Sequence, residues 1–266
     1  DILNHPKRHE YDLSSVDNIG YAGMSMTSAL TERCQSEFQP GHFINFYGSS
    51  EIFCFTVCDH VAQKPGCAGR PGFGQIIRVV EADPEGNSGP GDVVSPGESG
   101  EVIAPMEGME AFSGYWKRSD ADAKSIRDGW YFTGDLGYFD KEGELYLVGR
   151  VDDMVISGGE NIYPEEVEDI LSKSPLVKQA AVVGMQDDRM GSKIVAFIEP
   201  ASTKCSGEKL DQWCLSSSLA RFKRPRAYVF VKNIPRSSAG KLLRRLLRAG
   251  EYELNENFES TFLQGK

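Results

Sequence analysis

Several features that would place a chain in a narrow class are missing here. No apolar run approaches the roughly 18 residues that a membrane-spanning helix needs, so we predict no membrane span. Positive charge is also scarce, with 29 Lys and Arg against 39 Asp and Glu and a formal net charge of −10. Nucleic acids and acidic membranes attract positively charged proteins. The charge balance therefore argues against a general binder of either, although a local basic pocket for an anionic ligand is compatible with it.

Paired cysteines are missing as well. The six cysteines are scattered and form no Cys-x-x-Cys pair. No segment has the pattern of a secretory signal peptide, so we expect a cytoplasmic protein with reduced thiols. Cys54, Cys58 and His60 lie close together in the sequence, but their spacing matches no common zinc framework and no fourth ligand is evident. The sequence therefore favours no zinc site.

The length of 266 residues suits one large domain or two ordinary ones, and 40% hydrophobic residues can fill a core. The chain has no internal repeats and no low-complexity tract. We predict a polar loop at 1–15, a short buried strand at 18–23, a helix at 27–38 and a strand at 43–47. This strand–helix–strand order is typical of a parallel α/β layer.

From about residue 69 the pattern changes to short alternating runs. Runs at 75–81, 100–104, 137–139 and 145–148 are separated by Gly and Pro, which predicts a small antiparallel, barrel-like subdomain. The segment 83–97 is rich in Gly, Pro, Asp and Ser and is expected to be an exposed loop. Residues 140–143 are expected to form a hairpin turn.

After Asp153 the pattern is that of an α+β domain. We predict helices at 164–172 and 209–220, strands at 179–183, 193–198 and 226–231, and a basic helix at 241–249. The predicted fold class is therefore α/β plus α+β. Residues 1–151 would form the C-terminal portion of a large domain, and residues 152–266 a small α+β domain.

The segment 149–168 is the most informative part of the sequence. It passes from an apolar strand end through a charged turn to Gly158 and Gly159, and then to a helix start at Pro164. Proline suits a first helical turn because its missing N–H costs nothing there, and the helix dipole favours the acidic residues that follow. Two adjacent glycines indicate either a backbone that passes close to a ligand or a tight turn.

Three further segments combine residue types suited to nucleotide chemistry. Glycine permits a sharp turn after a strand, hydroxyls suit phosphate oxygens, and a carboxylate there suits Mg²⁺. An aspartate fixed in a turn suits ribose hydroxyls, and a lysine on a mobile loop suits charge that builds on phosphate. Taken alone, each also fits a plain turn or a solvated lysine. The segments are Tyr47-Gly48-Ser49-Ser50-Glu51, Trp130-Tyr131-Phe132-Thr133-Gly134-Asp135 and Pro235-Arg236-Ser237-Ser238-Ala239-Gly240-Lys241-Leu242-Leu243-Arg244-Arg245.

In this order, the segments resemble the motifs of the adenylate-forming (AMP-binding) enzymes. The motif sequences are most similar to those of the acyl- and aryl-CoA ligases, such as 4-chlorobenzoate-CoA ligase and the fatty-acyl-CoA ligases. The resemblance covers about residues 20–245. It implies ATP, Mg²⁺ and coenzyme A as cofactors and a carboxylic acid as substrate. Ser50 replaces the usual Thr and keeps its hydroxyl. Met24, in Ala22-Gly23-Met24-Ser25, stands where a small residue is usual.

The resemblance also implies a role for each matching residue. For the nucleotide, it implies that Gly23, Tyr47 and Gly48 lie at or near the adenine. Ser50 would contact the α-phosphate and Glu51 would bind Mg²⁺. Asp135 and Arg150 would contact the ribose and phosphate. For the later domain, it implies adenylation by Lys241, a hinge at Asp152, the pantetheine arm at Gly158 and Gly159, and the CoA nucleotide at Phe222 and Arg224.

One family feature is absent from these residues: the Ser/Thr/Gly-rich phosphate loop with its following Pro-Lys-Gly. We therefore expect the chain to correspond to the C-terminal half of a longer ATP-dependent CoA ligase. Two alternatives stay open, an adenylation enzyme that loads a carrier-protein phosphopantetheine and a non-catalytic binding fragment. The sequence leaves a homo-oligomer open.

The acid substrate is suggested only by a short apolar run. Ile52, Phe53 and Phe55 favour an aromatic or medium-to-long aliphatic acid, although they also fit a plain core. No Arg or Lys lies between Asn45 and Val61 to pair with a second carboxylate.

Overall fold

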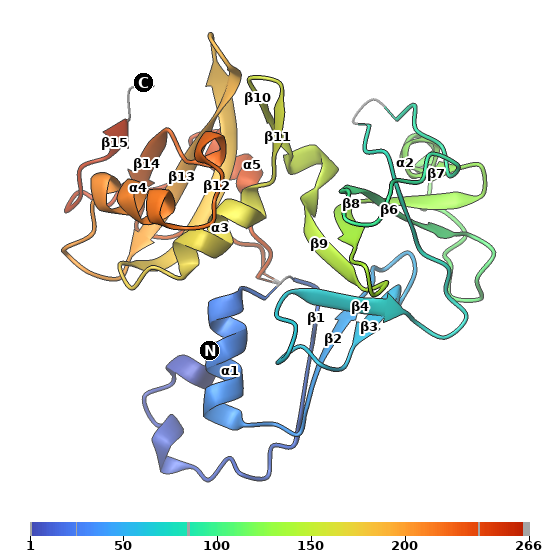
Figure 1. Ribbon diagram of the computed structural model, residues 1–266, viewed down its shortest axis with the longest axis horizontal. Coiled ribbons are helices and arrows are strands. Elements are labelled where there is room, and N and C mark those ends of the chain that lie inside the picture. Colours follow the sequence, from blue (N-terminus) through green and yellow to red (C-terminus); the bar gives the residue numbers. More distant parts are fainter. Residues whose placement is uncertain (1, 25, 84–85, 239, 263–266) are drawn as a thin grey trace. The chain divides into compact units, whose positions relative to one another are not determined.

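The computed structural model describes residues 2–24, 26–83, 86–238 and 240–262. The chain divides into two compact units, Asp1–Val151 and Asp152–Lys266 (Figure 1). Both combine sheets with few helices, which confirms the predicted mixture of α/β and α+β structure. Among the described helices, none combines the length and apolar character needed to cross a bilayer.

The first unit is built on one sheet, in which nine strands are described, in the order β1-β2-β3-β4-β9-β8-β6-β5, with β7 paired to β8. Only β1 and β2 are parallel among these pairs, and the other described pairs are antiparallel. The strands are β1 (Asn18–Ala22), β2 (His42–Tyr47), β3 (Thr56–Cys58), β4 (Cys67–Pro71), β5 (Arg78–Val80), β6 (Gly100–Pro105), β7 (Ile126–Arg127), β8 (Trp130–Phe139) and β9 (Leu145–Arg150). The antiparallel part continues the parallel pair instead of forming a separate sheet.

Helix α1 (Ser28–Phe38) connects β1 to β2, as predicted. Its N-terminus is capped by the Thr27 side chain, which accepts a hydrogen bond from the backbone N–H of Leu30 at 3.4 Å. Strand β1 alternates between exposed and half-buried residues, so the prediction of a buried strand was wrong. The predicted loop at 1–15 contains two short 3₁₀ helices, Ile2–Asn4 and Arg8–Glu10.

The hairpin between β8 and β9 has the turn that the sequence predicts. The Asp140 carboxylate accepts hydrogen bonds from the backbone N–H groups of Glu142 and Glu144, at 2.8 and 2.9 Å. Gly143 has a φ of 76°, which glycine adopts without strain. An aspartate that bonds the backbone two residues on is a common way to fix a tight turn. Helix α2 (Ser119–Ser125) lies between β6 and β7 in the chain.

The second unit has a four-stranded sheet among its described residues, in the order β12-β13-β14-β15. Strand β14 is parallel to β13, and the other pairs are antiparallel. A separate hairpin pairs β10 with β11. The elements are β10 (Val155–Ser157), β11 (Glu160–Ile162), α3 (Pro164–Ser172), β12 (Val177–Asp187), β13 (Gly191–Pro200), α4 (Gly207–Ser216), β14 (Ala227–Phe230), α5 (Arg244–Arg248) and β15 (Thr261–Phe262).

The two faces of this sheet follow from the alternation of side chains along each strand. Val182 packs on the face that contacts α3 and α4, through residues such as Leu171 and Leu210. Its neighbours Ala181 and Val183 pack on the opposite face with Leu247 of α5. The predicted helix at 241–249 is shorter than expected. It begins only at Arg244, because Leu242 pairs with Arg236 in an antiparallel β-bridge.

A buried ion-pair network connects α5 to the rest of the second unit. The Arg244 guanidinium pairs with Glu165 and Glu168 of α3, at 2.8 and 2.9 Å, and with Asp153 at 3.2 Å. It also donates a hydrogen bond to the Val182 carbonyl at 3.2 Å. Burial raises the pKa of the Glu165 carboxyl to about 7, and the nearby Arg244 charge opposes this rise.

The pKa of Glu165 predicts how the stability of this unit changes with pH. Its ordinary value is 4.5, so between about pH 4.5 and 7 the folded chain holds a proton that the unfolded chain has lost. The free energy of unfolding is therefore expected to fall as pH rises through this window. Glu165→Gln removes the titrating group and should reduce that fall.

The measurement is a series of urea unfolding curves between about pH 5 and pH 8, within the range where the linkage acts. Glu166→Gln is the matched control, because Glu166 is adjacent in α3 but pairs at the surface with Lys223. An equal fall in the parent and in Glu165→Gln would contradict the prediction.

Candidate functional site

Asp135 joins three elements of the first unit. Its strand β8 pairs with β9, where Arg150 lies opposite Asp135 and donates a hydrogen bond from Nη1 to Oδ1 at 2.6 Å. The Tyr47 hydroxyl, at the end of β2, donates to Oδ2 at 2.8 Å. The structure thus brings together Tyr47, Asp135 and Arg150, which are far apart in the sequence. Asp135 lies within a strand, so the expectation of a turn at this residue was wrong.

The backbone before Asp135 is shaped by glycine. Gly134 has a φ of 70°, and a Cβ at this position would lie 2.8 Å from Nη2 of Arg150. The Gly134 N–H donates to Oε1 of the buried Glu101 at 2.9 Å, and the Thr133 hydroxyl donates to the Val102 carbonyl at 2.8 Å. Two neighbouring residues of strand β6 therefore fix the backbone that presents the Asp135 carboxylate.

The segment after β2 forms a tight turn that starts at Gly48. A Cβ at Gly48 would lie 1.9 Å from the Phe53 carbonyl oxygen, so only glycine fits there. The Ser49 hydroxyl accepts hydrogen bonds from the backbone N–H groups of Glu51 and Ile52, at 3.2 and 3.3 Å. Ser50 is exposed at the tip of this turn. Its hydroxyl is therefore accessible to a ligand.

Glu51 is held as a carboxylate. Burial opposes its ionisation, but hydrogen bonds outweigh burial and hold the pKa of Glu51 below its ordinary value. The Tyr115 hydroxyl donates the main one, to Oε1 at 2.6 Å. A half-buried carboxylate that stays ionised is a suitable ligand for Mg²⁺. Sequence reasoning missed Tyr115, because it lies 64 residues from Glu51 in no recognised motif.

The apolar run after Glu51 divides into core and surface. Ile52 and Phe55 are buried, with 1% and 0% of their surface exposed, and belong to the main core of this unit. Phe53 is 81% exposed. The alternative of a plain core therefore holds for two of the three residues.

At the other predicted adenine contact, Gly23 directly follows β1, has a φ of 80° and has open space where a Cβ would lie. Met24 is exposed beside it, and Ser25 lies outside the described residues. The strand-to-turn geometry at Gly23 agrees with the pattern seen in the sequence.

In the second unit, Gly158 and Gly159 form the turn of the β10–β11 hairpin. Their φ values of 60° and 87° are those of a two-residue type I′ turn, which favours glycine. The Gly158 N–H donates to the Met190 carbonyl at 2.9 Å. The tight turn that the sequence left open is present, and the sequence did not predict the hairpin around it. A ligand contact at this turn remains a prediction.

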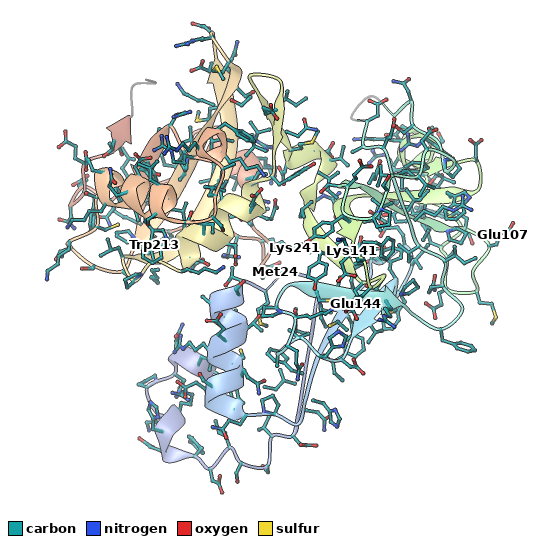
Figure 2. The ribbon with its side chains drawn as sticks, viewed as in Figure 1. Met24, Glu107, Lys141, Glu144, Trp213 and Lys241 are labelled. Atoms are coloured by element: carbon teal, nitrogen blue, oxygen red, sulfur yellow. The ribbon has the colours of Figure 1, made fainter. Side chains whose placement is uncertain are left out.

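Lys241 is exposed and lies three residues before α5 (Figure 2). The Ser237 N–H donates to the Lys241 carbonyl at 2.8 Å, and the Ser237 hydroxyl accepts from the Lys241 N–H at 3.1 Å. Arg236 fixes this turn to β12 by donating to the Gln179 side chain at 2.8 Å. The position of the Lys241 Cα is thereby defined, while its side chain extends toward solvent.

The remaining predicted residues differ in accessibility. Phe222 is 44% exposed in a short 3₁₀ helix, Arg221–Lys223. The Arg224 guanidinium is largely buried and pairs with Asp211. A phosphate at Arg224 would therefore compete with that carboxylate. Asp152 is the first residue of the second unit.

Two family models match the chain. Residues 1–116 match the AMP-binding enzyme model, and residues 166–241 match the model of the AMP-binding enzyme C-terminal domain. Among curated proteins, the chain is 36% identical over 255 residues to a 4-chlorobenzoate-CoA ligase of an Arthrobacter species. The aligned region covers 95% of this chain and 47% of that protein. The chain is 40% identical over 238 residues to a 2-succinylbenzoate-CoA ligase of Bacillus cereus, covering 88% and 46%.

Solved structures give a similar result. An anthranilate CoA ligase in complex with anthranoyl-AMP matches with a TM-score of 0.82 at 28% identity, covering 94% of this chain and 47% of that one. The o-succinylbenzoate CoA synthetase of Bacillus subtilis, in complex with its acyl-adenylate, matches with a TM-score of 0.75 at 33% identity, covering 87% and 46%. The chain thus spans about half the length of the relatives it matches.

Proposed function

Because the chain belongs to the adenylate-forming family of AMP-binding enzymes, we propose that it binds an adenylate and serves the ATP-dependent conversion of a carboxylic acid to its CoA thioester. The matching relatives include ligases of 4-chlorobenzoate, long-chain fatty acids and 2-succinylbenzoate. Since these relatives are about twice as long, the activity is proposed for the natural protein that contains this chain.

The observation that carries the proposal is the cluster of Tyr47, Asp135 and Arg150. A carboxylate oriented by a tyrosine hydroxyl and an arginine is suited to accept hydrogen bonds from two ribose hydroxyls. The turn that carries Ser50 and Glu51 follows directly after Tyr47, so groups for phosphate and Mg²⁺ adjoin the group for ribose. This combination of residues suits a nucleoside monophosphate together with Mg²⁺.

In the proposed reaction, a carboxylate oxygen attacks the α-phosphorus of ATP and pyrophosphate leaves. The sulfur of CoA then attacks the acyl carbon, AMP leaves, and the thiol proton is released. Bound at Glu51, Mg²⁺ would neutralise charge on the phosphate oxygens. Lys241 would stabilise the charge that builds in the first step. Gly158, Gly159, Phe222 and Arg224 would serve CoA, with Asp152 as the hinge.

For the acid, we propose an aromatic or medium-to-long aliphatic chain. The exposed Phe53 follows the Glu51 turn, and no cationic side chain lies between Asn45 and Val61 to hold a second carboxylate. The 4-chlorobenzoate and long-chain fatty acids named for two of the relatives support this choice, whereas the 2-succinylbenzoate named for another carries a second carboxylate. A pocket without a cationic partner would bind malonate poorly.

The nucleotide site predicts a specific loss on substitution of Asp135. We expect the 266-residue chain to bind AMP weakly, and Asp135→Asn to weaken that binding by about tenfold or more, because the amide cannot accept from two hydroxyls equally well. Calorimetric titration with AMP measures this. Asp120→Asn is the control, since Asp120 pairs with Arg118 at the surface. Equal affinities in all three proteins would contradict the assignment.

Lys241 predicts a separation of the two half-reactions. In the natural protein that contains this chain, Lys241→Ala should slow adenylate formation by about 100-fold or more, because it removes a charge that acts in the transition state. Transfer of a supplied acyl-adenylate to CoA should be spared. Pyrophosphate release and thioester formation are measured separately, with Lys232→Ala as a surface control. Equal loss of both half-reactions would rule out this role.

The proposed acid class is tested by comparing kcat/KM of the same natural protein for acetate, malonate, benzoate and octanoate. Benzoate or octanoate should exceed acetate and malonate by about tenfold or more, since each buried methylene contributes about 0.8 kcal/mol. A clear preference for malonate or acetate would show that the apolar-acid proposal is wrong, without affecting the nucleotide site.

A further inference from the structure

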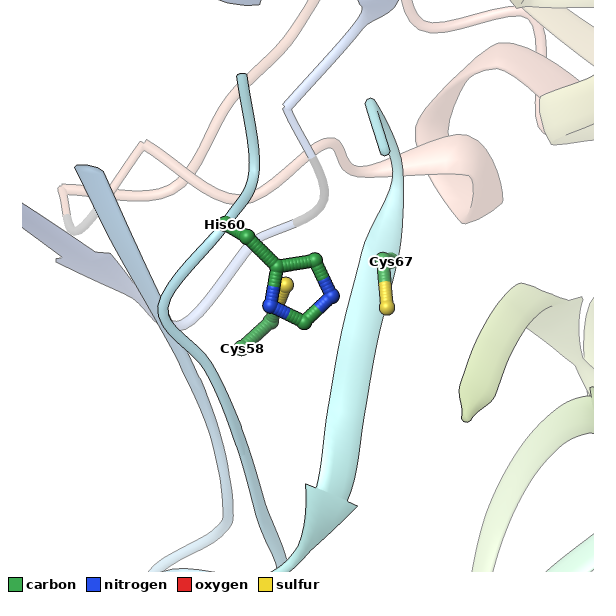
Figure 3. Close-up of side chains that lie close together, drawn as sticks. All are labelled: Cys58, His60 and Cys67. Carbon is green, nitrogen blue, oxygen red and sulfur yellow. The ribbon is translucent and has the colours of Figure 1, made fainter. Parts of the chain in front are cut away.

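Three metal-binding side chains converge in the first unit, apart from the residues discussed above. Cys58 ends β3, Cys67 begins β4, and His60 lies in the connection between them. One ligand atom from each lies within 4.8 Å of the others. Figure 3 shows the imidazole and the two thiols gathered at one point between the strands. Both cysteines are fully buried, whereas His60 is partly exposed.

The hydrogen bonds of His60 suit a metal ligand. Its Nδ1 lies 2.8 Å from Oδ1 of Asp59, and its Nε2 lies 3.0 Å from Oε1 of Glu144. A histidine that binds a metal usually donates its other N–H to a carboxylate, which fixes the ring and its tautomer. Asp59 supplies that acceptor at Nδ1. A metal bound at Nε2 would lie between this atom and Glu144 and would replace the present contact between them.

Glu144 lies beside two of these three side chains, His60 and Cys67. It is 3% exposed and lies at the end of the β8–β9 turn (Figure 2), next to β9, which pairs with β4. Its Oε2 is 3.7 Å from Sγ of Cys67. The Gly69 N–H donates to the same sulfur at 3.2 Å, a contact that also stabilises a metal-bound thiolate. Two sulfurs and one ring nitrogen therefore lie within reach of one another, and the Glu144 carboxylate adjoins His60 and Cys67.

We propose that Cys58, His60, Cys67 and Glu144 bind one zinc ion in a closed structural site. Zinc takes four Cys, His and carboxylate ligands in tetrahedral geometry, whereas Mg²⁺ and Ca²⁺ prefer oxygen alone. Binding replaces the two thiol protons, which are released to solvent. With two thiolates and one carboxylate, the occupied site carries a net charge of −1.

Neighbouring cations offset that charge. Lys64 Nζ lies 2.6 Å from Oε2 of Glu144, and Arg70 Nε lies 3.5 Å from Oε1. Lys64 also pairs with Asp140 and Glu142, at 3.4 and 2.5 Å. The Lys64 ammonium group thus already pairs with the three carboxylates of Asp140, Glu142 and Glu144. A metal ion is accordingly expected on the cysteine side of Glu144.

The structure explains why the sequence did not indicate this site. Cys54, which lies near Cys58 and His60 in the sequence, directs its sulfur to the Thr56 carbonyl at 3.6 Å instead. Cys67 takes its place through the pairing of β3 with β4. The fourth ligand, Glu144, is 77 residues beyond Cys67 and arrives only through the pairing of β4 with β9.

The test uses the 266-residue chain, purified under reducing conditions and freed of metal. Titration with Co²⁺ should give one equivalent of tetrahedral, thiolate-bound cobalt, seen by its charge-transfer and d–d absorption, and Zn²⁺ should displace it. Cys58→Ser and Cys67→Ser should abolish this spectrum. His60→Gln and Glu144→Gln should weaken Co²⁺ binding by about tenfold or more. Cys54→Ser is the matched control and should bind as the parent does.

Thermal unfolding with and without Zn²⁺ gives a second measurement, independent of the nucleotide site. Zinc should raise the Tm of the parent and of Cys54→Ser, because a ligand that binds only the folded state stabilises it. It should raise that of His60→Gln less. The partly exposed His60 makes this variant the least disruptive of the four.

Three outcomes would overturn the proposal. The folded parent could show no thiolate-bound cobalt and no zinc-dependent rise in Tm. Cys54→Ser could lose the spectrum. Alternatively, peptide mapping could find a disulfide between Cys58 and Cys67 while the reduced chain binds no zinc. The two cysteines would then form a redox-active pair instead of a metal site.

Discussion

The pairing of β8 with β9 is the constraint on which the first unit depends. β9 pairs with β4 and β8 pairs with β6, so this hairpin joins the two parts of the sheet. At one end of the hairpin, Asp135 faces Arg150 and receives the Tyr47 hydroxyl. At the other end, the Asp140 turn places Glu144 beside Cys67. One pair of strands therefore positions Asp135 and Arg150 for the proposed nucleotide site and Glu144 for the proposed zinc site.

In the second unit, the corresponding constraint is electrostatic. Arg244 pairs with two carboxylates of α3 and with the carboxylate of Asp153, and it also donates a hydrogen bond to the backbone of β12. Removal of one partner from such a buried network leaves an uncompensated charge, which typically costs several kcal/mol. The turn that ends at Lys241 lies directly before this anchor. The exposed Lys241, whose backbone is held by Ser237, is thus followed three residues later by a buried, fully paired arginine.

Elements with local signals could be predicted from the sequence. The helix at 27–38 has a Thr cap, the helix at 164–172 starts with Pro, and both were confirmed with nearly the same bounds. The turn at 140–143 was confirmed because its Asp and Gly act within four residues. The fold class followed from the order of such elements and from the family resemblance.

Features that depend on distant residues could not be predicted. Tyr115 reaches Glu51 across 64 residues, and Glu144 reaches Cys67 across 77. The shortened α5 and the β10–β11 hairpin were also not predicted, although both depend on residues close together in the sequence. Local propensity favoured a basic helix from Lys241, but Leu242 pairs with Arg236 in an antiparallel β-bridge instead. The roles of the individual site residues remain predictions, because they concern ligands.

The net charge of −10 bears on the proposed function through the arrangement of charges. The cations nearest the predicted ligand contacts are mostly paired: Arg150 with Asp135, Arg224 with Asp211, and Lys223 with Glu166. An anionic ligand at these positions must compete with a carboxylate for the cation. This competition lowers the affinity for the ligand and makes binding depend more strongly on where the ligand places its charged groups. At Asp135 we expect this competition to favour the nucleotide. A ribose hydroxyl can replace Arg150 as a hydrogen-bond donor to Asp135, and the guanidinium charge of Arg150 can then face the phosphate. An acidic chain can therefore select a nucleotide by the arrangement of its ion pairs, without a basic surface that would attract polyanions in general.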